Sequence, residues 1–227
     1  MSKPYKIPLI NRIIRPPLRL FFRGLLSVLS PISVTGLENV PKSGAYIIAM
    51  NHVSMYEAPF ILAFWPTLPE SMGAIDIWRK PGQNILVRLY GAIPVHRGEF
   101  DRQTLERAIS ALESGRPLLI APEGGRTHKP GMRQAHSGVA YLADKTAMPI
   151  LPVGITGTTE DYASLAFRFK RPPLGMQIGQ PIQFPPVRER GEERRRIYQE
   201  NTDLVMTKIA ALLPPEYQGV YAPKAAL

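Results

Sequence analysis

Short apolar runs alternate along this chain with longer segments in which apolar residues recur every three or four positions. Three runs have the composition of buried strands: residues 45–50, 117–121 and 150–155. In the segment 101–114, which Gly115 ends, four apolar side chains share one helical face: Leu105, Ala108, Ile109 and Leu112. Strands that alternate with helices predict an α/β fold with a mostly parallel sheet flanked by helices.

The remaining elements follow from the same patterns. Further helices are expected at residues 58–64, 83–90, 137–145 and 192–213. Further strands are expected at residues 32–36, at the edge of the sheet, and at 71–75, 91–97, 175–178 and 181–184. The tail after Pro214 is expected to be loosely ordered.

The amino-terminal segment has a basic and an apolar side. Arginines spaced three, four and four positions apart form one stripe on a helix: Arg12, Arg15, Arg19 and Arg23. Apolar residues fall opposite: Ile10, Ile14, Pro17, Phe21, Leu25 and Val28. This pattern is typical of a helix that lies in a membrane interface, and packing on the protein's own core is the alternative. Pro16 and Pro17 predict a break in the helix.

The length of the apolar runs limits how the chain can meet a membrane. None reaches the ~20 uncharged residues that a spanning helix needs, and no signal-peptide pattern follows the basic start. We therefore expect residues 1–30 to form a membrane-association segment and residues 31–227 to form one α/β domain. The protein should be monotopic, on the cytoplasmic face of the membrane.

Composition and charge limit the kinds of site and binding partner that the protein can have. With 227 residues, 44% of them apolar, the chain can bury one large core. The absence of cysteine excludes disulfides, thiol nucleophiles and cysteine metal sites, and is compatible with a reducing cytoplasm. The net charge is +10, and six basic residues from Lys3 to Arg23 precede the first acidic residue, Glu38. This asymmetry indicates an anionic partner, either lipid headgroups or nucleic acid.

Polar residues follow the strand at 45–50 abruptly, in the run Asn51-His52-Val53-Ser54-Met55-Tyr56-Glu57. A histidine five residues before a carboxylate can act as a general base held by its orienting partner, if the chain turns between them. The same run fits a helix capping box, in which Glu57 accepts a hydrogen bond from the amide of Ser54. Both interpretations stay open on this stretch alone.

A second polar cluster, Pro122-Glu123-Gly124-Gly125-Arg126-Thr127, follows the strand at 117–121. Two glycines let the backbone approach a ligand, and an arginine beside exposed amides indicates an anion site. An ordinary turn is the alternative. Ligand sites of open α/β sheets lie at such carboxyl ends of strands.

Four blocks now stand in order: Asn51-His52-x-Ser54-x-x-Glu57, Gly91-x-Ile93-Pro94-Val95-x-Arg97, Pro122-Glu123-Gly124-Gly125-Arg126 and Leu151-Pro152-Val153-Gly154-Ile155. Together with residues 34–41 they resemble the glycerophospholipid acyltransferase family, most closely the bacterial 1-acylglycerol-3-phosphate acyltransferases, over about residues 32–158. The resemblance implies transfer of a fatty acyl chain from acyl-CoA or acyl-carrier protein to a lysophospholipid hydroxyl, giving phosphatidate from 1-acylglycerol 3-phosphate. It implies no cofactor and no metal. Glycerol 3-phosphate or another lysophospholipid is the alternative acceptor.

The resemblance also implies roles for single residues. His52 is the general base and Glu57 orients it. The substrate-binding residues are Arg97, Glu123, Gly124, Gly125 and Arg126, with the two arginines on the acceptor phosphate. Asn51 and Ser54 support the catalytic pair, and the Pro152 block shapes the pocket floor.

Three positions depart from the family pattern. Glu57 stands where aspartate is usual, so its longer side chain must reach His52 through a different rotamer. Gly125 replaces the usual threonine. Ala74 stands where members often carry a lysine that stabilises charge at the reacting carbonyl. Lys80 is the nearest lysine but is out of register, so the sequence assigns no oxyanion donor.

Three other functions have weaker support. Aromatic residues are only 8% of the chain and do not interleave with basic ones, so we expect no nucleic-acid partner. A hydrolase with Ser54 as nucleophile lacks the G-x-S-x-G turn. A metal site is possible in principle from the four histidines, whose spacing matches no zinc pattern: His52, His96, His128 and His136. The last two are expected to be exposed.

Overall fold

Seven strands form one sheet at the centre of the structure, a computed structural model that describes residues 5–96 and 101–223. The strands are β1 (Ile32–Thr35), β2 (Ile47–Met50), β3 (Glu70–Ala74), β4 (Ile93–Val95), β5 (Leu118–Ile120), β6 (Ile150–Thr156) and β7 (Leu174–Ile178). Their order is β1-β7-β6-β2-β5-β3-β4, and the pairs are parallel apart from β6 with β7. The predicted mostly parallel sheet is confirmed, with β1 at an edge.

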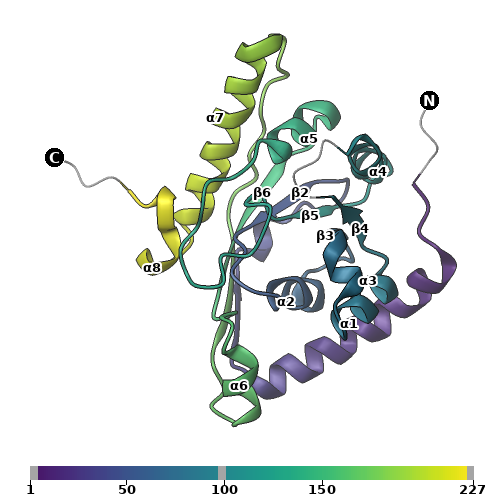
Figure 1. The fold of residues 1–227 in the computed structure, drawn as a ribbon, viewed down its shortest axis with the longest axis vertical. Coiled ribbons are helices and arrows are strands. Elements are labelled where there is room, and N and C mark those ends of the chain that lie inside the picture. The colour runs from purple at the N-terminus through teal and green to yellow at the C-terminus, as the bar shows by residue number, and fades with distance from the viewer. Residues whose placement is uncertain (1–4, 97–100, 224–227) are drawn as a thin grey trace.

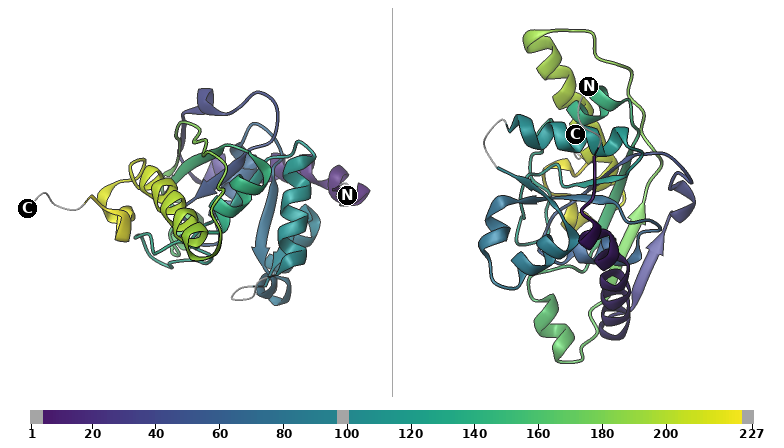
Figure 2. Two further views of the ribbon diagram at one scale, coloured as in Figure 1. Left: turned by 90° about the horizontal axis from the view of Figure 1, so that it is seen from above. Right: turned by 90° about the vertical axis from the view of Figure 1, so that its right-hand side faces the viewer.

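Helices cover both faces of this sheet (Figures 1 and 2). They are α1 (Leu9–Leu29), α2 (Glu57–Phe64), α3 (Gln83–Tyr90), α4 (Arg102–Glu113), α5 (Gly138–Thr146), α6 (Tyr162–Phe167), α7 (Gly191–Ala210) and α8 (Pro215–Gln218). Side chains alternate along β2, so Ile47 and Ala49 pack in a core with α4, α5 and α7. Ile48 and Met50 pack in a second core with α1, α2 and α6. Because both faces are buried, β2 reads as a continuous apolar run.

Most of the predicted elements are present within a few residues of their expected bounds. Residues 181–184 are an exception, because they contribute only an isolated bridge between Ile150 and Ile182. Helix α6 was not predicted, since six residues carry too little periodicity to identify a helix. The end of the predicted segment 91–97, including Arg97, lies outside the described residues.

The prediction of a loose tail after Pro214 is wrong for residues 215–223. Helix α8 buries Tyr217 in the core, and a 3₁₀ turn (Gly219–Tyr221) follows it. The Tyr221 hydroxyl accepts from the amide of Ala135 at 3.0 Å and donates to Asp203 at 2.9 Å. These aromatic anchors, spaced four apart, hold the segment on the domain.

The predicted break at Pro16 and Pro17 is also wrong, because α1 runs through both prolines. Each proline in a helix interior costs about 3 kcal/mol, since it removes a hydrogen bond and crowds the preceding turn. Both rings lie on the exposed side of α1, where water can reach the unpaired carbonyls. Packing of the opposite side on α2 and α3 offsets the cost.

Three of the four arginines in the α1 stripe contact the protein itself, while Arg12 and Arg23 stay exposed to solvent. Arg15 is 1% exposed and forms two hydrogen bonds of 2.7 Å with Glu70, which is fully buried. Arg19 donates to backbone carbonyls at the end of α2, among them that of Trp65 at 2.7 Å. Arg23 lies over the ring of Phe64, 5.5 Å from its centroid. The arginines are drawn to the unpaired carbonyls at the end of α2 and to a buried carboxylate, neither of which the pattern of α1 alone reveals.

The apolar side of α1 is consequently left open to solvent. The residues exposed there by 60–71% are Leu9, Ile10, Ile13, Leu20, Phe21 and Val28. Apolar side chains gathered on one helix face in this way gain free energy when they leave water. None of the helices in the described chain combines the length and the apolarity needed to cross a bilayer.

Candidate active site

The turn after β2 is fastened to the neighbouring strand by Asn51. Its side-chain amide donates to the carbonyl of Ile155 at 3.0 Å, and its Oδ1 accepts from the amide of the same residue at 2.8 Å. Asn51 is 1% exposed, so neither hydrogen bond competes with water. The fourth block of the sequence, which contains Ile155, therefore holds the first block in place.

His52 and Glu57 form the pair that their spacing predicts. His52 Nδ1 lies 2.9 Å from Glu57 Oε2, and the carboxylate is fully buried. The amide of Ser54 donates to both oxygens of Glu57, at 2.9 and 3.0 Å. The capping contact and the histidine–carboxylate pair therefore coexist, with α2 beginning at Glu57 itself. Turning the chain between the two residues lets the longer glutamate reach the ring.

Thr158 is a further partner of Glu57 for which the sequence gives no signal. Its hydroxyl donates to Glu57 Oε1, and its side chain is fully buried. It follows β6 at the same sheet edge, 101 positions along the chain from Glu57. With His52, the Ser54 amide and Thr158 as partners, the carboxylate has its orientation fixed on several sides.

Glu123 holds the backbone of His52. Its Oε1 accepts from the His52 amide at 2.8 Å, its Oε2 accepts from the Arg133 amide at 3.0 Å, and it is 1% exposed. Burial raises the pKa of Glu123, although these hydrogen bonds oppose the shift. The His52 carbonyl accepts from the amide of Thr127 at 2.9 Å. The observed contacts of Glu123 thus position His52, and its predicted contact with an acceptor stays a prediction.

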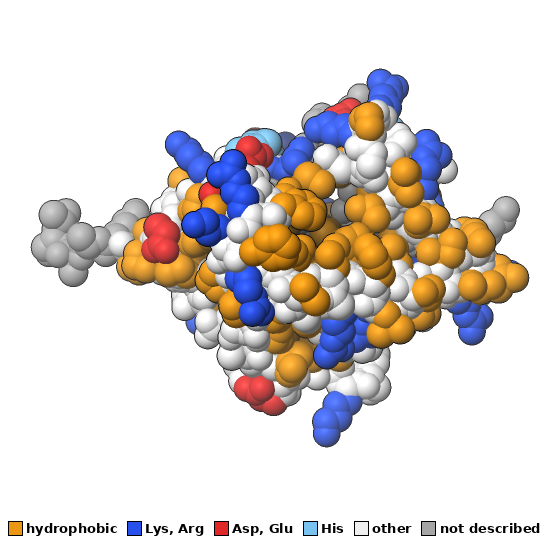
Figure 3. Space-filling model, turned by 90° about the horizontal axis from the view of Figure 1, so that it is seen from below, with side chains coloured by type: hydrophobic (Ala, Val, Ile, Leu, Met, Phe, Trp, Pro, Cys, Tyr) orange, Lys and Arg blue, Asp and Glu red, His pale blue; other side chains and the backbone are white. Residues whose placement is uncertain are grey.

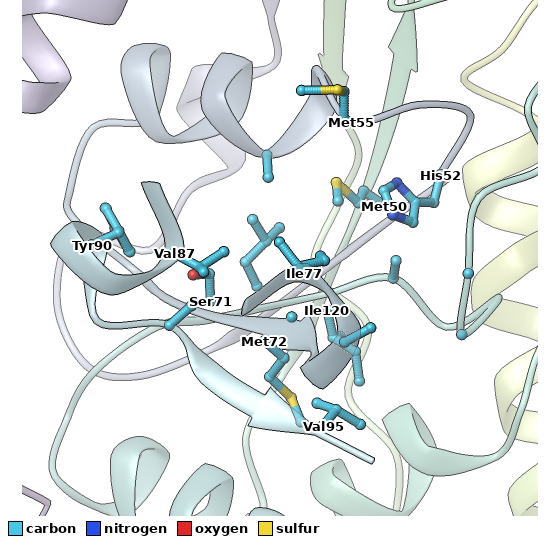
Figure 4. A pocket seen from close by; sticks show the side chains of 18 of the residues that line it. Met50, His52, Met55, Ser71, Met72, Ile77, Val87, Tyr90, Val95 and Ile120 are labelled. Carbon is cyan, nitrogen blue, oxygen red and sulfur yellow. The ribbon is translucent and has the colours of Figure 1, made fainter. Parts of the chain in front are cut away.

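A cavity of about 500 Å³ opens beside His52. In Figure 4, His52 lies toward one end of this cavity and Tyr90 toward the other, with the apolar side chains of Met72, Ile77 and Val87 between them. Its floor includes side chains of α1, among them Leu18 and Phe22. The histidine–carboxylate pair therefore faces an elongated apolar space, which is suited to a hydrocarbon chain.

The same cavity is also lined by two glycines and four basic side chains: Gly124, Gly125, Lys80, His96, Arg126 and His136. Gly124 has φ of +66°, and a Cβ there would lie 2.8 Å from Cδ2 of His136, so only glycine fits. Within the described chain, the Arg126 guanidinium has no ion-pair partner, which leaves it available to an anion. The predicted cluster at residues 124–126 and His52 therefore share one cavity, whereas Arg97 is outside the described residues.

Lys80, which the sequence comparison places out of register, lines this cavity. Ala74 and Lys80 both line the cavity, Ala74 from the end of β3 and Lys80 from the end of a 3₁₀ turn (Ile75–Arg79). His96 and His136 also line it, although no motif identifies them. Of these residues, His96 is already paired, with its Nδ1 3.0 Å from the carboxylate of Asp101.

Two of the alternative sites lack support in the geometry. Ser54 is 1% exposed, its hydroxyl accepts from the Tyr56 amide at 3.1 Å, and it does not line the cavity. Across residues 5–96 and 101–223, no three His, Cys, Asp or Glu side chains come close enough together to hold a metal. His128 and His136 are exposed, as predicted, and His128 bonds to Glu160.

Known proteins share both the sequence and the fold. The chain is 32% identical over 134 residues to a 1-acyl-sn-glycerol-3-phosphate acyltransferase of Borreliella burgdorferi, an alignment of 58% of this chain and 53% of the relative. It is 28% identical over 127 residues to a lyso-ornithine lipid O-acyltransferase of Pseudomonas aeruginosa, covering 56% of this chain and 48% of the relative. The chain thus spans about half the length of these curated relatives.

A solved structure agrees with this likeness. The crystal structure of the 1-acyl-sn-glycerophosphate (LPA) acyltransferase PlsC from Thermotoga maritima superposes with a TM-score of 0.61 at 25% identity, over 85% of this chain and 77% of that one. The Acyltransferase family model matches residues 31–156, which is more than half of the chain and contains all four blocks. The chain therefore belongs to the acyltransferase family.

Proposed function

We propose that this protein transfers a fatty acyl chain from acyl-CoA or acyl-carrier protein to the free hydroxyl of 1-acylglycerol 3-phosphate, giving phosphatidate. The observation that carries the proposal is the His52–Glu57 pair, 2.9 Å apart, at the end of an apolar cavity of about 500 Å³. That volume lies within the roughly 300–1,000 Å³ of small-molecule pockets. Family membership and the names of the relatives support the same reaction.

His52 acts as the general base in this mechanism. With its Nδ1 proton donated to Glu57, the other ring nitrogen, Nε2, is free to accept a proton from the acceptor hydroxyl. The hydroxyl oxygen then attacks the thioester carbonyl and forms a tetrahedral oxyanion. Glu57 stabilises the imidazolium, which returns the proton to the leaving thiolate. General-base help of this kind is typically worth ~10²- to 10⁴-fold in rate.

Cationic side chains at the cavity bind the charged parts of the reactants. We assign the acceptor phosphate to Arg126 and Arg97, because a guanidinium presents two donors to phosphate oxygens at once. Lys80, which lines the cavity, supplies positive charge toward the oxyanion. The acyl chain lies along Met72, Ile77 and Val87.

The acceptor is a lipid, so the enzyme works at a membrane surface, and we place it on the cytoplasmic face. The exposed apolar side of α1 supports contact with a membrane, since its side chains gain free energy when they enter the boundary between headgroups and acyl chains. Leu18 and Phe22 of the same helix line the cavity. A single helix therefore contacts the bilayer on one side and the acyl chain on the other.

The experiment that tests the proposal is acyl transfer by purified protein with two donors and three acceptors. The donors are acyl-CoA and acyl-carrier protein; the acceptors are lysophosphatidate, glycerol 3-phosphate and lyso-ornithine lipid, which lacks a phosphomonoester. We expect phosphatidate from lysophosphatidate with at least one donor. The absence of phosphatidate with both donors would overturn the proposal, whichever other acceptor is acylated.

Arg126→Gln separates phosphate recognition from the chemistry. It should raise KM for lysophosphatidate about tenfold or more, because a hydrogen bond to a charged group is worth ~1.5–3 kcal/mol, and leave turnover of lyso-ornithine lipid unchanged if that lipid is used. Arg195→Gln, on the exposed side of α7, is the matched control and should change neither. An equal effect of both variants would remove Arg126 from the acceptor site.

A further inference from the structure

The turn that follows α6 exposes two aromatic rings among three basic residues. Phe167 is 71% exposed and Phe169 is 83% exposed, the largest exposed fraction of any large hydrophobic side chain in the described chain. Arg168, Lys170 and Arg171 alternate with them and continue the turn, and their side chains form no ion pair among the described residues. Nothing in the proposed catalytic mechanism uses this segment.

The backbone of this turn does not favour a bulky residue. The amide of Lys170 donates to the carbonyl of Leu165 at 3.0 Å, and that of Phe169 donates to Ala166 at 2.9 Å. These are the two bonds of a Schellman helix end, in which the residue at the position of Phe169 is left-handed and usually glycine. Phe169 has φ of +57° and Arg171 has φ of +47°. Large side chains at these two positions therefore work against the fold, and their benefit must lie outside it.

The turn lies at the same end of the molecule as the carboxyl end of α1 (Figures 1 and 2). The hydroxyls of Ser30, which caps α1, and Tyr162, which begins α6, are 2.8 Å apart and buried. Leu26 of α1 and Ala166 of α6 pack in one core cluster. The turn that carries the exposed rings is therefore held next to the carboxyl end of α1, the helix whose apolar side chains are open to solvent.

The face that contains α1 and α6 has the character of a lipid-binding surface. Figure 3 views the molecule from this side and shows hydrophobic side chains gathered around a hollow, with Lys and Arg side chains among them. Aromatic rings flanked by cations suit the boundary of an anionic bilayer, where the rings enter the headgroup layer and the charges meet lipid phosphates.

We propose that residues 167–171, with Phe167 and Phe169 as the inserting side chains, are a second membrane contact that acts together with α1 on an anionic bilayer. The inference rests on the proposed function, which supplies a lipid substrate. A single helix lying on a membrane can roll about its own axis. A second contact off that axis fixes the roll, so the cavity beside α1 keeps one orientation toward the bilayer.

The test is cosedimentation of the full chain with vesicles of phosphatidylcholine containing phosphatidylglycerol, and with phosphatidylcholine alone. The double variant Phe167→Ser/Phe169→Ser should bind the anionic vesicles about tenfold more weakly or worse, because two aromatic side chains no longer enter the bilayer. The matched control, Leu204→Ser/Val220→Ser, removes two exposed apolar residues from α7 and the 3₁₀ turn and should bind as wild type does. Equal binding by both double variants, or no binding by the wild type, overturns the proposal.

The variant Phe169→Gly tests vesicle binding without destabilising the fold. Glycine suits the left-handed position, so the melting temperature should stay the same or rise while vesicle binding weakens. Acyl transfer to a short-chain, water-soluble lysophosphatidate without vesicles should be unchanged in Phe169→Gly and slower by ~10²- to 10⁴-fold in His52→Ala. If the wild-type protein shows no acyl transfer, the proposed function is contradicted. If Phe169→Gly binds vesicles as the wild type does, the proposed membrane contact is contradicted.

Discussion

Replacing Arg15 by methionine should destabilise the fold by about 3 kcal/mol, because it breaks a buried ion pair. Arg15 is 1% exposed, Glu70 is fully buried, and both guanidinium–carboxylate distances are 2.7 Å. Removing one partner of a buried pair typically costs ~3–5 kcal/mol, since the other charge stays in a medium of low polarity. Arg116 and Tyr5 also donate to Glu70, so we expect the lower end of that range.

Urea unfolding followed by tryptophan fluorescence measures this loss. Trp65 is fully buried in the α2 core and donates to the hydroxyl of Tyr46, so its emission changes when the fold opens. The control is Arg102→Met, which breaks an exposed pair with Glu106 and should cost less than about 0.5 kcal/mol. Equal free energies of unfolding for Arg15→Met and Arg102→Met would refute the claim that this pair anchors α1.

The double variant Arg15→Met/Glu70→Met sharpens the test. An apolar replacement of both partners is often neutral for stability, because no charge is then left buried without a partner. We expect the double variant to recover most of the loss, since Arg116 is 33% exposed and can turn to water. A double variant that is less stable than Arg15→Met would mean that packing, and not charge, explains the cost.

Three further predictions concern pH and the catalytic pair. Burial raises the pKa of Glu70, but the hydrogen bonds and charge of Arg15 outweigh it and hold the pKa below the ordinary 4.5. The stability that this carboxylate contributes should therefore be complete above pH 4.5 and be lost as the pH falls below it. Glu70→Gln should reduce this dependence of the urea unfolding midpoint on acidic pH. Glu57→Gln should lower kcat by about 10²-fold or more with little change in KM, because a neutral amide cannot stabilise the imidazolium of His52; a wild-type kcat would refute the pairing. Asn51→Ala should lower the free energy of unfolding in urea by about 1–3 kcal/mol, because it leaves the buried amide and carbonyl of Ile155 unpaired. A change within error of zero would show that the two hydrogen bonds of Asn51 do not stabilise the fold.

Local features of the site could be predicted from the sequence because their partners are close along the chain. His52 and Glu57 are five positions apart, and the strand before them fixes where they emerge. The hydrogen bonds that hold this turn in place could not be predicted, because the residues that make them lie far away along the chain. Thr158 is 101 positions from Glu57, and Ile155 is 104 positions from Asn51. Only the folded sheet brings them to one edge.

The amino-terminal helix shows the limit of pattern reasoning more sharply. The sequence shows the arginine stripe and the apolar side of this helix. Which of them faces the protein depends on Glu70, which lies 55 positions from Arg15 and belongs to no periodic pattern. A buried carboxylate attracts the basic side inward and so turns the apolar side outward. The same tertiary packing carries α1 through Pro16 and Pro17, where propensity alone predicts a break.

The most direct test of the central claim is the rate of free CoA or free carrier protein release by wild type and His52→Ala, with lysophosphatidate and the preferred donor. If an imidazole held by Glu57 takes the acceptor's proton, the wild type should turn over and His52→Ala should be slower by ~10²- to 10⁴-fold at neutral pH. The amide of Ser54 and the hydroxyl of Thr158 still pair with the buried Glu57 when the ring is removed, so the variant should stay folded, which its urea unfolding curve checks. A folded His52→Ala protein that transfers acyl chains at the wild-type rate would contradict the account.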